Sequence, residues 1–128
     1  MGCGDKQQQD VIKVGLIVEL TGDMPGVGAS SKNAAQMAVA EQNSVGGISI
    51  GGKPYQIELV VEDNASKADQ SVAAVNKLIT QDNVVAIVGP NASLGAIPAA
   101  EIAPELNGAG ITEVSEGRPR KSAAKFRR

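Results

Sequence analysis

The sequence alternates between short apolar runs typical of buried strands and longer segments with helical spacing. The runs are rich in β-branched residues and span residues 11–18, 55–61, 84–88 and 111–114. The segments between them, 29–43, 69–81 and 93–106, place apolar residues at helical intervals. Such alternation predicts an α/β fold, a three-layer arrangement of a parallel sheet with helices on both faces. We expect the four strands in the order 2-1-3-4.

Several local signals set the expected boundaries of these elements. Ser30 or Ser31 is a plausible cap for the first helix, because a serine hydroxyl accepts from the first free N–H groups. Residues 21–28 contain three glycines and a proline and are expected to be a loop. Residues 48–53 are expected to be a turn-rich excursion, and residues 1–10 a tether.

The composition argues against catalysis. The 128 residues suffice for one domain, contain no His and have a single Cys, so no internal disulfide is possible. We find no Ser/His/Asp set, no Cys/His set and no cluster with metal-ligand spacing. The chain is therefore expected to be neither an enzyme nor a metalloprotein, and to need no cofactor. No apolar run reaches the length of a membrane span.

Charge divides the chain in two. Residues 1–115 hold 6 Lys/Arg against 13 Asp/Glu, a net charge of −7. Residues 116–128 hold 6 Lys/Arg against one acidic residue, a net charge of +5. Because the acidic body offers no basic face to continue the basic tail, nucleic acid is not an expected partner. We interpret residues 116–128 as a basic tail of uncertain origin.

Cys3 lies in a Met-Gly-Cys-Gly sequence followed by a polar stretch. This arrangement resembles a bacterial lipoprotein processing site, although the apolar signal that should precede it is missing from the sequence. The alternative is a stray exposed thiol. The lipoprotein interpretation makes Cys3 a lipidation site and places the protein in the periplasm or on the outer face of the cell membrane.

Ligands of open parallel sheets bind outside the carboxyl ends of the strands, where the strand order reverses. The loops at that point are 21–28 and 89–93, and the second leads directly into a helix. Free N–H groups at a helix start attract an anion such as a carboxylate, and Ser93 adds a hydroxyl. The alternative is that Asn91 or Ser93 only caps the helix.

A nucleotide-binding domain of an enzyme remains a competing hypothesis. Residues 26–31 come close to a dinucleotide fingerprint but have Ser in place of the last glycine. Glu62 and Asp63 end the second strand, where such folds carry a ribose-binding acid. A solvated strand end explains these two acids more simply.

Taken in order, several motifs resemble the N-terminal part of the proteins of one family. They are Ile12-Lys13-Val14-Gly15, Leu20-Thr21-Gly22, Gly46-Gly47, Ile57-Glu58-Leu59-Val60-Val61-Glu62-Asp63-Asn64, Ala73-Ala74-Val75-Asn76-Lys77-Leu78-Ile79 and Val85-Ala86-Ile87-Val88-Gly89-Pro90. This order resembles the branched-chain amino acid (leucine/isoleucine/valine) substrate-binding proteins of ABC transporters, which are type I periplasmic binding proteins. The match covers about residues 11–112.

The resemblance implies a two-lobed receptor that closes on an amino acid and presents it to an ABC permease in the membrane. By position, Ser93 would hold the ligand's carboxylate, with Asn91 and Ala92 beside it. Val27 occupies the place where the family often has an aromatic residue. Residues 112–116 depart from the family pattern, so residues 11–115 are expected to form a truncated first lobe. Such a fragment would bind weakly without the missing second half, unless it is a non-functional remnant.

Overall fold

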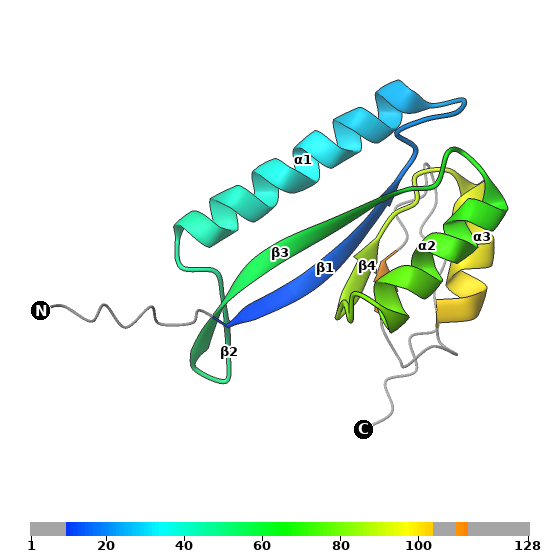
Figure 1. Ribbon diagram of the computed structural model, residues 1–128. Helices are drawn as coiled ribbons and strands as arrows, with labels where there is room; N and C mark the ends of the chain where they lie inside the picture. Colours follow the sequence, from blue (N-terminus) through cyan, green and yellow to red (C-terminus); the bar gives the residue numbers. More distant parts are fainter. Residues whose placement is uncertain (1–9, 104–109, 113–128) are drawn as a thin grey trace, which may run out of the picture.

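The computed structural model describes residues 10–103 and 110–112, which form a layered α/β unit (Figure 1). The elements in chain order are β1 (Val11–Val18), α1 (Pro25–Ser44), β2 (Ile48–Ile50), β3 (Lys53–Asp63), α2 (Ala68–Thr80), β4 (Ala86–Val88), α3 (Ser93–Ile102) and β5 (Gly110–Thr112). Within this part of the chain, no helix is long and apolar enough to cross a membrane.

The sheet has the order β2-β3-β1-β4-β5. The strands β3, β1, β4 and β5 run parallel to their neighbours, which confirms the expected order 2-1-3-4. The sheet is not wholly parallel, however. Residues 48–53, expected to be a turn-rich excursion, do contain a turn but also supply β2, which pairs antiparallel with β3. Gly51 and Gly52 both have positive φ and make the tight turn between these strands.

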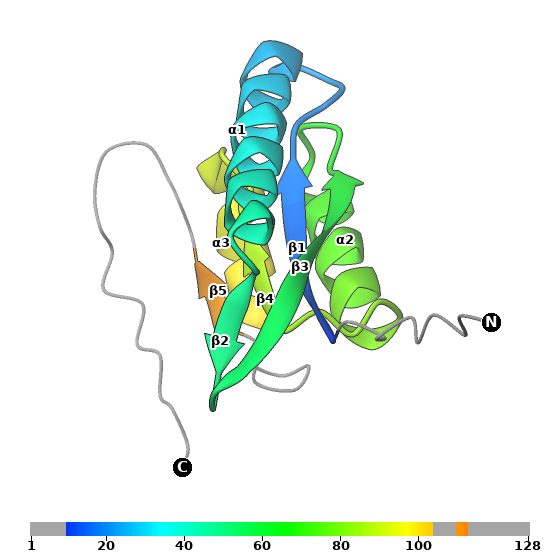
Figure 2. The ribbon, with the colours of Figure 1, turned by 90° about the vertical axis from the view of Figure 1, so that its left-hand side faces the viewer.

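Helices cover both faces of the sheet. Figure 2 shows α1 on one side of β1 and α2 on the other. The helices α2 and α3 pack against each other, and their small and branched residues close over the sheet. This core contains Ile17, Ala74, Val75, Leu78, Ile79, Val84, Ile87, Ala99 and Ala103. Gly15 leaves room for it, because a Cβ there would lie 2.8 Å from the Leu78 side chain.

The first helix begins four residues earlier than its apolar pattern indicates. Pro25 stands at its first position, where a fixed φ and a missing N–H are favourable. The expectation of a serine cap was wrong, because the helix has no side-chain cap and Ser30 Oγ instead donates to the Gly26 carbonyl. The loop expected over residues 21–28 therefore ends before Pro25. Among the described residues, the other helix and strand boundaries differ from the expected ones by a few residues at most.

Gly28 lets α1 approach the end of β1 closely. A Cβ on this residue would lie 2.1 Å from the Glu19 carbonyl oxygen and 2.3 Å from its carbon. Since these are backbone atoms, they cannot swing aside as a flexible side chain could. The first turn of α1 is thereby seated directly against the residue that follows β1.

Candidate functional site

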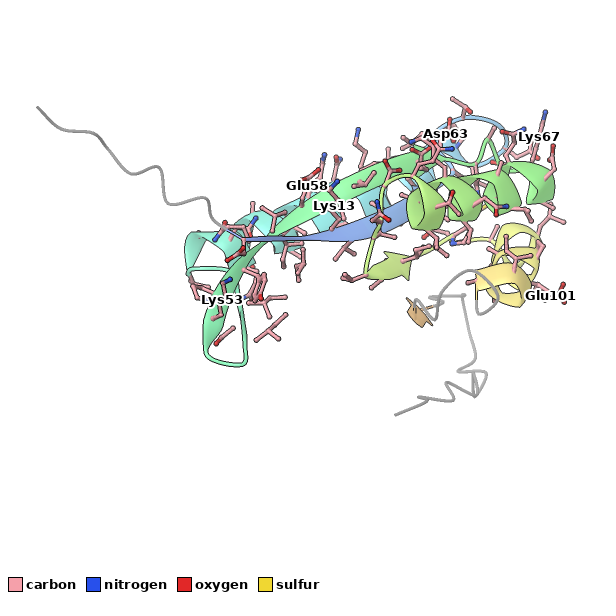
Figure 3. The ribbon with its side chains drawn as sticks, turned by 60° about the horizontal axis from the view of Figure 1, so that its bottom comes forward. Lys13, Lys53, Glu58, Asp63, Lys67 and Glu101 are labelled. Carbon is pink, nitrogen blue, oxygen red and sulfur yellow. The ribbon has the colours of Figure 1, made fainter. Side chains whose placement is uncertain are left out.

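The carboxyl ends of β1, β3 and β4 meet at one rim of the sheet, where α1, α2 and α3 begin (Figure 1). Figure 3 labels Asp63 and Lys67 at this rim, while Lys53 lies at the opposite end. Both loops singled out by the sequence pattern lie on this rim. The helix that follows the first loop is bonded to the second loop, because Ser31 Oγ of α1 donates to Asn91 Oδ1 over 2.9 Å.

A buried carboxylate lies at the centre of the rim. Glu19 follows β1 directly and has an exposed fraction of 0%. Asn91 Nδ2 donates to its Oε2 over 2.7 Å, and the Ala92 N–H donates to its Oε1 over 3.2 Å. Asn64 Nδ2 also donates to Oε1, over 3.3 Å. The end of β1 is thus bonded to the turns that follow β3 and β4.

These bonds keep Glu19 ionised. Burial by itself raises the pKa of the Glu19 carboxyl, because water no longer solvates the charge. The hydrogen bonds from Asn91, Ala92 and Asn64 stabilise the charged form and more than offset burial, so the pKa lies below its ordinary value. The rim therefore carries a fixed negative charge at neutral pH.

Asp63 binds the loop between β1 and α1. Its Oδ1 accepts from the N–H groups of Leu20 and Thr21 over 3.0 Å and 3.3 Å, and from the Ala65 N–H over 2.8 Å. Its Oδ2 accepts from the Thr21 hydroxyl over 2.7 Å. Burial raises the pKa of Asp63, but these donors outweigh it and the pKa lies below its ordinary value.

The two acids that end β3 have different partners within the protein. Asp63 is committed to a structural loop, and Glu62 forms an ion pair with Lys77 of α2. Both acids keep intermediate exposure, as expected of a solvated strand end, and each also has a partner within the protein.

The helix α3 begins with Ala92 as its N-cap and has no side-chain cap. Asn91 therefore does not cap the helix, because its amide is engaged by Glu19 and Ser31. Among the described residues, no partner accepts from the N–H groups of Ser93 and Leu94. Ser93 is exposed, as is Leu94 with 66% of its surface accessible. These donors point out of the first turn of α3 toward solvent or a ligand.

Val27 lies in the first turn of α1, with 42% of its surface exposed. It precedes Ser31 by four residues, so the two lie on one face of the helix. Because Ser31 bonds to Asn91, this face of α1 borders the turn before α3. The structure thus brings Val27 and residues 91–93 to one rim, whereas Cys3 lies outside the described residues.

Glu19 was missed as a candidate by the sequence interpretation. The available signal was an acid between Val18 and Leu20, at the end of a continuous apolar run. A buried charge needs hydrogen-bond partners. The sequence does not identify them as Asn91 and Ala92, which lie 72 and 73 residues away. Within the part of the chain that the structure describes, no group of His, Cys, Asp and Glu could hold a metal ion.

The rim belongs to a fold seen in known receptors. The family model described as periplasmic binding protein matches residues 11–117. A Leu/Ile/Val-binding protein of Rhizobium johnstonii is 37% identical over 117 residues, covering 80% of this chain and 30% of the relative. An amino acid binding protein of Pseudomonas aeruginosa is 35% identical over 117 residues, covering 91% of this chain and 29% of the relative.

A solved structure of a substrate binding protein has the same fold as this chain. The branched-chain amino acid transporter substrate binding protein of Streptococcus pneumoniae, crystallised with isoleucine, matches with a TM-score of 0.74 at 35% identity. The match covers 83% of this chain and 29% of that protein. The chain thus spans about three tenths of the length of the relatives that it matches. It belongs to the branched-chain amino acid family of type I periplasmic binding proteins.

Proposed function

We propose that this chain forms one wall of the ligand site in an extracytoplasmic solute-binding protein that delivers an amino acid to an ABC transporter. One observation carries the proposal. The exposed start of α3 offers the Ser93 hydroxyl and two N–H groups that have no partner among the described residues, on the same rim as the half-exposed Val27. An anion-binding helix start beside an apolar side chain suits a zwitterion with an aliphatic side chain.

In this arrangement the ligand's carboxylate accepts from the N–H groups of Ser93 and Leu94 and from the Ser93 hydroxyl. Val27 contacts the ligand's aliphatic part, and Asn91 and Ala92 shape the floor beneath the carboxylate. The isoleucine bound to the similar Streptococcus pneumoniae protein supports this ligand class. No cofactor and no bond-breaking step are required, so the role is binding and not catalysis.

Membership of the family suggests a second part of the receptor and a permease as partners, and the sequence around Cys3 suggests a lipid anchor. A second part of the receptor would close over the ligand and supply acceptors for its ammonium group, and an ABC permease would receive the ligand. A lipid on Cys3 would hold the protein at the outer face of the membrane. Because affinity for a small ligand depends on its enclosure, the chain alone should bind with a Kd on the order of 1 mM.

The test is an NMR titration of the isotope-labelled full chain with L-isoleucine. The expected result is a saturable shift of the Ser93 and Leu94 amide signals. The Ser93→Ala variant should weaken binding about tenfold or more, because a hydrogen bond to a charged group is lost. The matched control is Ser49→Ala, on β2 away from the rim, which should bind as the parent chain does.

A parallel titration with NAD tests the nucleotide-binding alternative. Saturable shifts with NAD and none with isoleucine would replace the proposal by that alternative. Isoleucine shifts that are absent from the start of α3, or that Ser93→Ala leaves unchanged, would also refute it.

A further inference from the structure

The geometry points to Glu19 as the positioning residue of this site: its buried carboxylate sets the orientation of the Asn91 amide and fixes the start of α3 against the end of β1. As far as it concerns a ligand, this inference rests on the proposed function. Glu19 itself touches no ligand, because its side chain is fully buried. It acts through the residues that it holds.

The orientation follows from the chemistry of the carboxylate. An ionised carboxylate only accepts hydrogen bonds, so Asn91 must turn its NH2 group toward Glu19. The Asn91 carbonyl oxygen then faces α1, where it accepts from the Ser31 hydroxyl. A single buried charge thereby fixes the direction of two successive hydrogen bonds. The chain of bonds Glu19–Asn91–Ser31 links β1, the turn before α3 and the first half of α1.

The same carboxylate determines which N–H groups at the start of α3 are left without an acceptor. It takes the N–H of Ala92 and leaves those of Ser93 and Leu94 without a partner in the described part of the structure. The negative charge also sits at the positive end of the α3 dipole, where it is stabilised. A ligand carboxylate is consequently directed to the next two donors along the helix and excluded from the first.

Asn64, in the turn that follows β3, also holds Glu19 in place. Asn64 Nδ2 donates both to Glu19 and, over 3.0 Å, to Ser71 Oγ of α2. The first turn of α3 rests on this pair, since a Cβ on Gly95 would lie 2.4 Å from Ser71 Oγ and 3.1 Å from Asn64 Nδ2. Glu19 therefore cannot shift without moving α3, which is what a positioning residue requires.

Three variants test the inference in the full chain. Glu19→Gln keeps the shape of the side chain but offers an NH2 group where Asn91 Nδ2 now donates, so the Asn91 amide must turn over. Asn91→Asp places two carboxylates face to face. The double variant Glu19→Gln/Asn91→Asp restores every donor–acceptor pair, because the introduced amide at position 19 donates to the introduced carboxylate at position 91, which still accepts from Ser31.

The first readout is the free chain, without ligand. We expect Glu19→Gln and Asn91→Asp each to move the Ser93 and Leu94 amide signals, and the double variant to bring them back toward the parent positions. In the parent chain, one Asn91 side-chain N–H proton should lie downfield because its bond is charge-assisted, and Glu19→Gln should abolish this shift. Ser31→Ala, which leaves the Glu19–Asn91 bond intact, should keep it.

The second readout is the isoleucine titration. Binding to Asn91→Asp should be about tenfold weaker or worse, and the double variant should recover most of the loss, a non-additivity expected for residues in direct contact. Retention of the downfield Asn91 signal in Glu19→Gln, or failure of the double variant to recover the Ser93 and Leu94 signals of the free chain, would overturn the inference. If the parent chain does not respond to isoleucine, the proposed function fails, while the free-chain signals still decide the role of Glu19.

Discussion

The contact between Gly28 and the backbone of Glu19 yields a sharp prediction for stability. Changing Gly28 to Ala places a methyl group 2.1 Å from the Glu19 carbonyl oxygen, where real Cβ contacts essentially never fall below 3.0 Å. The helix α1 and the end of β1 must therefore move apart by roughly 1 Å. Such a movement disturbs the seat of the Glu19 carboxylate and the approach of Ser31 to Asn91.

Two effects oppose each other in Gly28→Ala. Alanine favours the helix over glycine by about 1 kcal/mol. Overpacking against atoms that cannot yield costs about 1–3 kcal/mol and occasionally more. Gly26 isolates the first effect, because it lies in the same turn of α1 and a Cβ there meets nothing within 4 Å. Gly26→Ala should therefore stabilise the chain by about 0.5–1 kcal/mol, whereas Gly28→Ala should be less stable than Gly26→Ala by the overpacking cost of about 1–3 kcal/mol.

The measurement is urea unfolding followed by far-ultraviolet circular dichroism for the parent chain and both variants. The slope should stay constant while the midpoint rises for Gly26→Ala and falls for Gly28→Ala. Equal midpoints for the two variants would refute the close approach of α1 to β1, and with it the geometry of the rim.

Two further predictions concern the core and the rim acids. Leu78→Ala, at a fully buried position between α2 and the sheet, should lower the free energy of unfolding by about 2–5 kcal/mol. Leu94→Ala, at an exposed position, should change it by under about 0.5 kcal/mol. Similar losses for the two variants in urea unfolding would contradict the assigned core. Acid should destabilise the chain through Glu19 and Asp63, because their pKa values lie below the ordinary ones in the folded state. Their contribution is present above the ordinary carboxyl pKa of about 4 and is lost as the pH falls through the folded values. The urea midpoint should thus drop less between about pH 6 and 3 in Glu19→Gln than in the parent chain, and an identical drop would count against an ionised, hydrogen-bonded Glu19.

The sequence by itself determined the class and order of the main elements, because apolar periodicity is a local property. The run before Glu19 was predicted to be a buried strand, and the apolar stripe containing Val75 and Leu78 to be the core face of a helix. The family resemblance likewise rested on local motifs in a fixed order, and the comparisons confirmed it.

The tertiary structure decided what those elements hold between them. The seating of α1 against the end of β1 depends on Gly28 fitting against the backbone of Glu19, a contact that no local pattern records. The roles of Asp63 and Glu19 depend on bonds to residues 42 to 73 positions away, which exist only because parallel strands bring their carboxyl ends to one rim. Hydrogen-bond partners are chosen by distance in space, and that distance is fixed only once the sheet has formed.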